Sequence, residues 1–257
     1  MTLSPDDRSA RAGGERRLAY LTNIPSPYRA VMIRAWAALN PDLAISVFYT
    51  DPDDQGRNWA ADAIGGGVRE IRLPVLASLG RYGKLNRSLV RMVRNHDVIM
   101  IGGFEQASYL AAAVLARIMA KPVILLSDGF SPARFGTESA PILALKRVTA
   151  RFADGFFANG VVGARYLREQ IGVGADRPIR NQFLSHSDLP IQQARDSLSG
   201  VTKAQIRQRL GRQADGDRSV LLSCGYLIRR KRNDLVIDAI ARLPAGMQPC
   251  VEARGRL

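Results

Sequence analysis

Short hydrophobic runs alternate with segments of helical periodicity along this chain, and this alternation restricts the folds it can adopt. Residues 97–101 and 122–126 are mostly hydrophobic and lack the period of two that marks a strand with one solvated face. Between them, residues 107–119 carry apolar side chains at helical spacing. Such hydrophobic runs are typical of parallel strands that are buried on both faces. The sequence therefore predicts an α/β fold with a doubly wound parallel sheet.

The periodicity also suggests how the chain is divided. Residues 1–17 are polar and charged and are expected to form a flexible tail. Residues 18–185 carry the strand and helix alternation of one domain, and the pattern fades over residues 186–218, which we interpret as an interdomain connection. A hydrophobic strand, a basic loop and an amphipathic helix then follow within residues 219–257, as at the start of a second α/β domain.

The composition limits the classes of partner. The formal net charge of +14 predicts attraction to polyanions such as nucleotide phosphates, anionic lipid or nucleic acid. Nucleic acid is disfavoured, because no helix-turn-helix or OB-type pattern and no interleaved aromatic residues accompany the charge. Cys224 and Cys250 form neither a metal-binding spacing nor a disulfide framework, which fits a reducing, cytoplasmic setting. The longest apolar stretch, residues 107–120, contains Arg117 and is too short to span a bilayer, so a soluble or peripheral protein is expected.

In a doubly wound sheet, ligands bind outside the carboxyl ends of the strands. The first loop at such an end covers residues 23–29, where two prolines would hold Ser26, Tyr28 and Arg29 in a set geometry. The alternative is a tight turn in which the tyrosine packs on the next helix.

Two further loops follow later strands. In residues 102–106, Gly103 would let a substrate approach the backbone, and Glu105 would either bind a polyol or merely favour the start of a helix. In residues 127–130, Asp128 would either orient a hydroxyl group as a base or cap the next helix.

The last such loop is strongly basic. Gly225 is followed by Arg229, Arg230 and Lys231, which stand between a strand and a helix N-terminus, where a diphosphate would bind. The alternative is a solvated run of charges. Because the sequence has only His96 and His186, it predicts neither a catalytic triad nor a metal site, and no catalytic residue is assigned.

Taken in order, several segments resemble bacterial glycosyltransferases of family 4 (group 1). They are residues 23–29, 97–103, 121–126, 151–160 and 223–235. The resemblance extends over residues 18–243. It implies a GT-B fold: one complete Rossmann-like N-terminal acceptor domain, followed by the first β-α(-β) piece of a Rossmann-like nucleotide-sugar domain.

The resemblance also implies an activity. A sugar would pass from a nucleotide-diphosphate sugar, the co-substrate, to a glycan or lipid-linked acceptor in polysaccharide or glycolipid synthesis, by a retaining, metal-independent mechanism without a cofactor. Gly225 and Lys231 match the family's diphosphate-binding positions. Tyr226 stands where the family has arginine, so Arg229 or Arg230 would supply that charge. A basic acceptor domain would rest peripherally on the inner face of an anionic membrane.

The family's Gly-x-Gly-Pro turn and its later pair of glutamates are not found before residue 257. The expectation is therefore a chain truncated within its donor domain, with impaired transfer. The alternative is a non-catalytic acceptor-type domain that binds a glycan, a lipid or a protein partner.

Overall fold

The structure is a computed structural model, and it describes residues 16–51, 63–127, 135–182, 188–209, 220–224, 232–244 and 250–254. The chain divides into two compact units, Met1–Asp188 and Leu189–Leu257. Each unit is described here on its own. The sequence placed the end of the first domain at residue 185.

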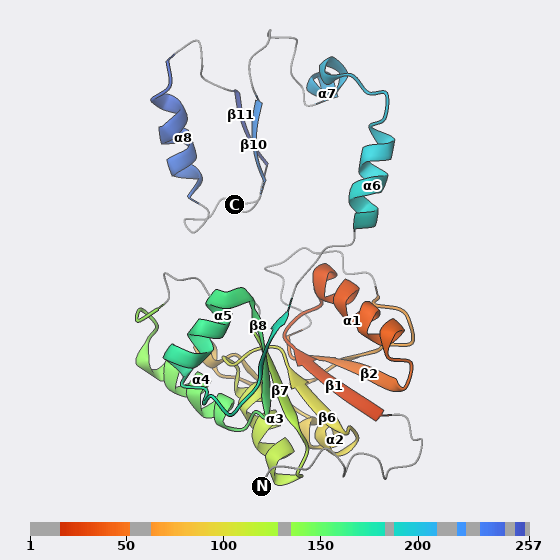
Figure 1. The fold of residues 1–257 in the computed structure, drawn as a ribbon, viewed down its shortest axis with the longest axis vertical. Helices are drawn as coiled ribbons and strands as arrows, with labels where there is room; N and C mark the ends of the chain where they lie inside the picture. The colour runs from red at the N-terminus through yellow and green to blue at the C-terminus, as the bar shows by residue number, and fades with distance from the viewer. Residues whose placement is uncertain are drawn as a thin grey trace. The chain divides into compact units, whose positions relative to one another are not determined.

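The first unit is built on a sheet of seven strands in the order β3-β2-β1-β6-β7-β8-β9, all of which pair in parallel (Figure 1). Its strands are β1 (Arg16–Thr22), β2 (Leu43–Tyr49), β3 (Arg69–Arg72), β6 (Val98–Ile101), β7 (Val123–Ser127), β8 (Gly155–Asn159) and β9 (Ile179–Gln182). The strand order reverses between β1 and β6. This topology confirms the doubly wound parallel sheet that the sequence predicts.

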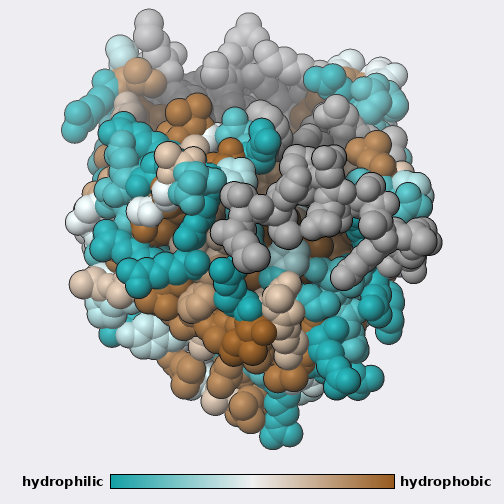
Figure 2. Space-filling model, turned by 60° about the horizontal axis from the view of Figure 1, so that its bottom comes forward, coloured by the Kyte–Doolittle hydropathy of each residue, from teal (hydrophilic) through white to brown (hydrophobic). Residues whose placement is uncertain are grey.

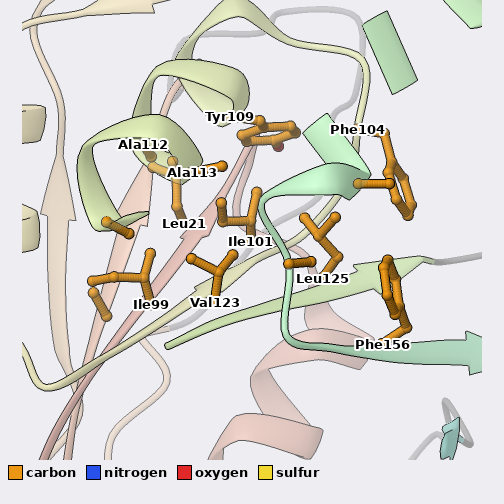
Figure 3. Close-up of a cluster of buried hydrophobic side chains, with 14 of the residues drawn as sticks. Leu21, Ile99, Ile101, Phe104, Tyr109, Ala112, Ala113, Val123, Leu125 and Phe156 are labelled. Atoms are coloured by element: carbon orange, nitrogen blue, oxygen red, sulfur yellow. The ribbon is translucent and has the colours of Figure 1, made fainter. Parts of the chain in front are cut away.

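Helices cover both faces of this sheet (Figure 1). They are α1 (Pro27–Leu39), α2 (Leu89–Arg94), α3 (Ala107–Ile118), α4 (Ala140–Arg151) and α5 (Gly160–Tyr166), which runs into a π-helical turn at Leu167–Ile171. Helix α1 packs on one face, where Met32 and Ile33 meet Val47 and Tyr49. Helices α2 to α5 contribute to the core on the other face. Figure 3 shows part of this core, with Tyr109, Ala112 and Ala113 of α3 beside residues of the strands. Burial of hydrophobic side chains on both faces explains why the strands lack a period of two.

The strand β1 begins at Arg16, so Arg16 and Arg17 belong to the sheet although the sequence assigns them to the tail. Main-chain hydrogen bonds hold them there: Arg16 N donates to Asp42 O at 3.0 Å, and Asp97 N donates to Arg17 O at 2.8 Å. The ladder bonds are independent of the side chain, which is why hydropathy does not reveal this end of the strand.

The helix α1 begins at Pro27, inside the segment that the sequence interprets as a loop because of its prolines. This interpretation is wrong for residues 27–29. A proline in the first helical turn costs nothing, because the N–H group that it lacks has no partner within the helix at that position.

Residues 84–94 carry apolar side chains at helical spacing, but the helix there is shorter than this spacing suggests. The first part of this segment is β5 (Lys84–Asn86), which pairs antiparallel with β4 (Val75–Ser78) around a 3₁₀ turn at Gly80–Tyr82. Ser88 has a φ of 67° and separates this hairpin from α2. Left-handed backbone at a non-glycine residue cannot continue a helix, which explains the difference.

The second unit contains the helices α6 (Asp188–Ser197, whose first residue closes the first unit) and α7 (Lys203–Arg209), both within the expected connection. The strands β10 (Val220–Cys224) and β11 (Cys250–Arg254) pair in parallel, with α8 (Asn233–Ala241) between them in the sequence. A parallel β-α-β unit is the piece of a second Rossmann-like domain that the sequence predicts.

Hydrophobic residues are not confined to the interior, and Figure 2 shows them gathered on one face among hydrophilic residues. In the described part of the chain, no helix combines the length and the apolar character needed to cross a membrane.

Candidate binding site at the sheet switch point

The candidate site lies where the chain leaves β1 and β6 in opposite directions across the sheet. Strand β1 ends at Thr22 and leads into α1, and β6 ends at Ile101 and leads into α3. Neither helix has an acidic residue in its first turn, so the free N–H groups there face no competing carboxylate of their own helix. Ligands of open α/β sheets bind at such a reversal of strand order.

Glycines bring these two segments into close contact. A Cβ atom on Gly102 would lie 3.0 Å from the Tyr20 hydroxyl oxygen and 3.2 Å from Thr22 Oγ1. A Cβ atom on Gly103 would lie 2.9 Å from Cε2 of the Tyr109 ring. All three distances are shorter than a relaxed contact allows, so the end of β6 can approach β1 and α3 only because it lacks side chains here.

Arg29 is the cation of this site. It is 7 % exposed, and its guanidinium donates a hydrogen bond to Thr22 Oγ1. Burial raises the pKa of the Tyr20 and Tyr109 hydroxyls, while the positive charge of Arg29 opposes the rise in both. These tyrosines therefore stay neutral near pH 7 and offer hydroxyl groups rather than negative charge.

Two hydroxyl groups of the site are buried without a hydrogen-bond partner among the described residues: those of Tyr20 and Ser26. Ser26 is 5 % exposed and occupies the N-cap position of α1 in an extended conformation, yet its side chain makes no capping bond. A buried hydroxyl that makes no hydrogen bond costs about 1–3 kcal/mol, and such groups in a folded protein call for an explanation. Both oxygen atoms are inaccessible to solvent, so a ligand with hydroxyl groups would satisfy them only by displacing neighbouring side chains.

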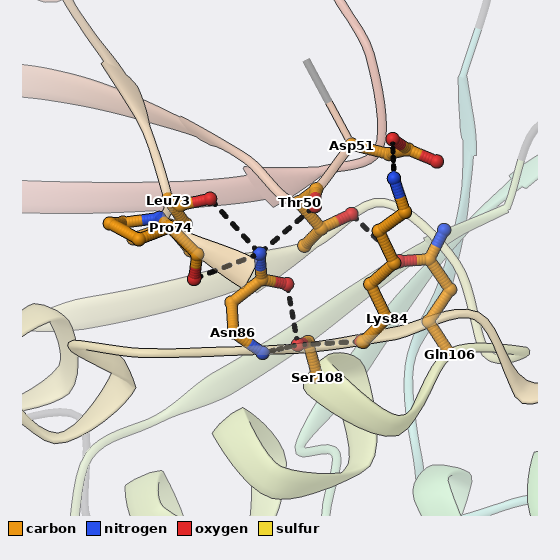
Figure 4. Close-up of polar contacts among 8 residues, drawn as sticks. All are labelled: Thr50, Asp51, Leu73, Pro74, Lys84, Asn86, Gln106 and Ser108. Carbon is orange, nitrogen blue, oxygen red and sulfur yellow. Dashed lines mark hydrogen bonds and ion pairs between the residues drawn. The ribbon is translucent and has the colours of Figure 1, made fainter. Parts of the chain in front are cut away.

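A second polar network supports the site from the side of β2 (Figure 4). Thr50, just beyond β2, donates a hydrogen bond to Gln106 Oε1 at 2.7 Å, and Gln106 is the N-cap residue of α3. The buried Asn86 side chain donates to the carbonyl oxygens of Thr50 at 2.9 Å and of Leu73 at 3.1 Å. These bonds tie the β4–β5 hairpin to the carboxyl end of the sheet.

Glu105 forms an ion pair that the sequence did not predict. Its Oε1 lies 2.8 Å from Nζ of Lys146, a fully buried lysine of α4. The same Nζ lies 2.6 Å from Glu138 Oε1 and 3.2 Å from the hydroxyl oxygen of Tyr166. Burial lowers the pKa of Lys146, but the contacts with the two carboxylates outweigh it, so the net pKa is raised and the lysine stays charged. Glu105 keeps an exposure of 51 % and remains accessible to a ligand.

The structure thus places Ser26, Arg29 and Gly103 at the switch point and Glu105 at its ion-paired margin. Tyr28 lies in the first turn of α1 and is half-buried. Five predicted residues lie outside the described residues: Asp128, Gly225, Arg229, Arg230 and Lys231.

Sequence reasoning missed Tyr20, Thr22, Tyr109 and the Lys146 cluster. The one available signal was Thr22, a polar residue that closes an apolar run. Tyr20 and Tyr109 look like ordinary core residues in the sequence, and nothing local distinguishes Lys146 from the basic residues around it. Within the described ranges, no group of three His, Cys, Asp or Glu side chains could hold a metal ion.

Comparison with solved structures shows what this architecture is similar to. An α,α-trehalose-phosphate synthase (UDP-forming) from Burkholderia vietnamiensis has a TM-score of 0.56 at 16 % identity, over 93 % of this chain and 63 % of its own. The sucrose-phosphate synthase from Thermosynechococcus elongatus has a TM-score of 0.56 at 13 % identity, over 94 % of this chain and 71 % of its own. The UDP-GlcNAc 2-epimerase from Neisseria meningitidis, solved bound to UDP-GlcNAc, has a TM-score of 0.51 at 13 % identity, over 92 % of this chain and 64 % of its own.

No protein-family model and no curated protein matches the chain by sequence. The structural likeness at such low identity shows the fold, and it confirms the predicted GT-B fold class. The chain spans 63 % of the length of the trehalose-phosphate synthase and 64 % of that of the epimerase.

Proposed function

We propose that this protein takes part in glycosyl transfer from a nucleotide-diphosphate sugar to a glycan or lipid-linked acceptor, and that the first unit holds the acceptor. The observation that supports this most is the pair of buried, unsatisfied hydroxyl groups of Tyr20 and Ser26 beside Arg29. A sugar offers hydroxyl groups that both donate and accept, so it would satisfy these atoms without bringing a net charge into the site.

The donor would bind the second unit. Gly225 would allow the diphosphate to approach the backbone, and Arg229, Arg230 and Lys231 would neutralise the departing nucleotide diphosphate. Transfer would be retaining and would need no metal ion, as in family 4 (group 1), because the basic side chains would supply the charge stabilisation. The protein would work in the cytoplasm, peripherally at the inner face of the membrane, in polysaccharide or glycolipid synthesis.

The structural neighbours guide the choice of donor. One neighbour is a UDP-forming synthase, and another is an epimerase solved bound to UDP-GlcNAc. We therefore use uridine nucleotides as the first probes. Because an epimerase shares the fold, the assay must separate transfer from epimerisation.

The first test is calorimetric titration of the full chain with UDP and UDP-GlcNAc, in the presence of EDTA. Lys231→Ala should weaken binding about tenfold or more, since a charge-assisted contact to phosphate is lost. The matched control is Arg151→Ala, an exposed arginine of α4 in the first unit, which should bind as wild type does. Equal affinity of wild type and Lys231→Ala would reject the role of that lysine.

The second test is product analysis with octyl β-D-glucoside as a soluble acceptor. Release of UDP together with a glycosylated octyl glucoside supports transfer. Conversion of UDP-GlcNAc to its 2-epimer without a new glycosidic bond would contradict it. Binding of the glycoside without turnover of any nucleotide sugar would favour the non-catalytic binding domain instead.

A further inference from the structure

One segment of the first unit is basic and lacks acidic residues. Residues 71–96 contain six lysines and arginines and no aspartate or glutamate. They form the β4–β5 hairpin and α2, which follow one another directly. Such a run of one sign of charge on an ordered surface attracts an anionic partner.

The hairpin combines this charge with exposed hydrophobic side chains. Val75, Leu76 and Leu79 are 43 %, 54 % and 44 % exposed, and all three lie within five consecutive residues. Arg81 follows at the turn, with its guanidinium carbon 5.1 Å from the centroid of the Tyr82 ring. Adjacent aliphatic, aromatic and basic side chains are the combination found where a protein meets the interface of a lipid bilayer.

The hairpin is held firmly at its base (Figure 4). Asn86 bridges to the ends of β2 and β3 as described above, and Lys84 forms an ion pair with Asp51. Ser108 Oγ of α3 lies 2.9 Å from Lys84 O. The exposed hydrophobic side chains therefore stand on an anchored element.

A cavity with basic residues at its margin adjoins the hairpin. It measures about 760 Å³ and extends between α2 and the strands β2 and β3. Phe48, Ile71 and Met92 line it together with Arg69 and Arg91, and none of the described residues that line it is acidic. A guanidinium group binds phosphate oxygens in a bidentate manner, so this cavity suits lipid phosphate groups.

Other exposed hydrophobic side chains of the first unit lack this context. Ile118 on α3 and Val161 on α5 stand apart from each other along the chain, with exposures of 74 % and 80 %. The neighbouring Arg117 occupies the last turn of α3, where the helix dipole already accounts for a cation. Arg81 lies in the turn of the hairpin and Arg87 follows β5 directly, so neither stands in the last turn of an α-helix.

We propose that the β4–β5 hairpin and α2 dock the protein on an anionic lipid bilayer: Val75, Leu76 and Leu79 insert at the interface, and the surrounding arginines contact lipid phosphates. Gly83 of the hairpin packs against Gln106 at the start of α3, where an added Cβ would lie 2.9 Å from Gln106 Cγ. Docking there would bring the switch-point site close to the bilayer. This inference rests on the proposed function in one respect: docking would bring a lipid-linked acceptor to the site.

The test is co-sedimentation of the full chain with vesicles of phosphatidylcholine alone, and with vesicles containing equal parts of phosphatidylcholine and phosphatidylglycerol. Wild type should bind only the anionic vesicles. The pair Leu76→Ser and Leu79→Ser should weaken binding at least tenfold, because less apolar surface is buried at the interface. The pair Arg81→Glu and Arg87→Glu should weaken it at least as much.

Two matched pairs control for surface hydrophobicity and for net charge. Ile118→Ser with Val161→Ser removes two apolar groups elsewhere that are even more exposed than Leu76 and Leu79. Arg151→Glu with Arg180→Glu reverses the same number of exposed charges on α4 and β9. Both control pairs should bind anionic vesicles within about threefold of wild type, since they leave the hairpin contacts intact. If the test and control pairs lost vesicle binding equally, the attraction would be a diffuse one and the proposal would be overturned. Unchanged vesicle binding by the hairpin variants would overturn it as well.

The titration with UDP and UDP-GlcNAc separates this outcome from that of the proposed function. Hairpin variants that lose vesicle binding should keep the nucleotide affinity of wild type. If nucleotide binding is found and vesicle binding is not, docking is wrong while glycosyl transfer stands. If vesicle binding follows the hairpin and no nucleotide sugar binds, the docking surface stands without the proposed activity.

Discussion

The segment that joins β1 to the first turn of α1 buries Ser26 and Arg29, whereas the loop after β6 presents backbone and one half-exposed carboxylate to the same edge of the sheet. Ser26 and Arg29 of the first are 5 % and 7 % exposed. In the second, Gly102 and Gly103 have no side chains, and Glu105 is 51 % exposed and bound to Lys146.

The two loops illustrate different ways of building a binding edge. In the first, a proline-initiated helix holds Ser26, whose hydroxyl group has no hydrogen-bond partner among the described residues. In the second, the Glu105 carboxylate is held by the buried Lys146. The glycines of this loop leave room for its backbone to approach β1 and α3 closely. Substitutions in the first loop should therefore change ligand binding, and substitutions around the second should change the stability of the fold.

The largest effect is expected for Lys146→Met. The change leaves the Glu138 carboxylate, which is 11 % exposed, without its buried cation and should lower the free energy of unfolding by about 3–5 kcal/mol. Denaturant unfolding near pH 7 measures it. Arg151→Met on the same helix is the control and should stay within about 0.5 kcal/mol of wild type. If the two variants were equally stable, the cluster would contribute nothing.

The pH dependence sharpens this test. Because the pKa of Lys146 is raised in the folded state, its contribution is fully present below the unfolded pKa of about 10.4 and is lost as pH rises through the folded value. The pKa of Tyr166, raised to about 12 chiefly by burial and by its bond to Glu138, acts in the same direction. Lys146→Met should therefore lose less stability than wild type does between about pH 9 and 11.

An intermediate effect is expected for Gly103→Ala. The new Cβ would lie 2.9 Å from the Tyr109 ring, which is fully packed, and the strain should cost about 1–3 kcal/mol in thermal unfolding. Gly155→Ala in β8 is the control, because its Cβ would lie 3.6 Å from Pro178 Cγ, an ordinary contact. A loss of stability that is the same at both positions would argue against a tight approach of β6 to α3.

The smallest effect on stability is expected for Ser26→Ala. An N-cap serine is normally worth about 1 kcal/mol, but this hydroxyl makes no capping bond. The free energy of unfolding should therefore not fall, and it should rise by about 1 kcal/mol because the cost of burying an unsatisfied hydroxyl is removed. Binding of octyl β-D-glucoside should nevertheless weaken about tenfold, because the ligand loses a buried hydrogen bond.

Ser139→Ala is the matched control for that change. Ser139 caps α4 in the same extended conformation and likewise makes no side-chain capping bond, but it is exposed. It should alter neither stability nor glycoside binding. A large loss of stability in Ser26→Ala would mean that the hydroxyl is satisfied within the protein, and the difference between the two loops would disappear.

The alternation of hydrophobic runs and helices was enough to predict the parallel sheet, its carboxyl-end loops and the positions of Ser26 and Gly103 in them, whereas Arg29 lies in the first turn of α1. These features follow from local hydropathy, from the period of each element and from proline and glycine, all of which can be read within a few residues. The binding roles of these residues stay predictions.

Only the tertiary structure decided which loops meet. Strand β1 lies beside β6 although Leu18 and its partner Val98 are 80 positions apart, and this pairing creates the switch point. The fully buried Lys146 lies in a helix whose sequence looks like any basic surface helix, and its role depends on carboxylates from two other segments. The hydropathy of a residue reports what it prefers on average, whereas its neighbours are set by how distant segments pack together.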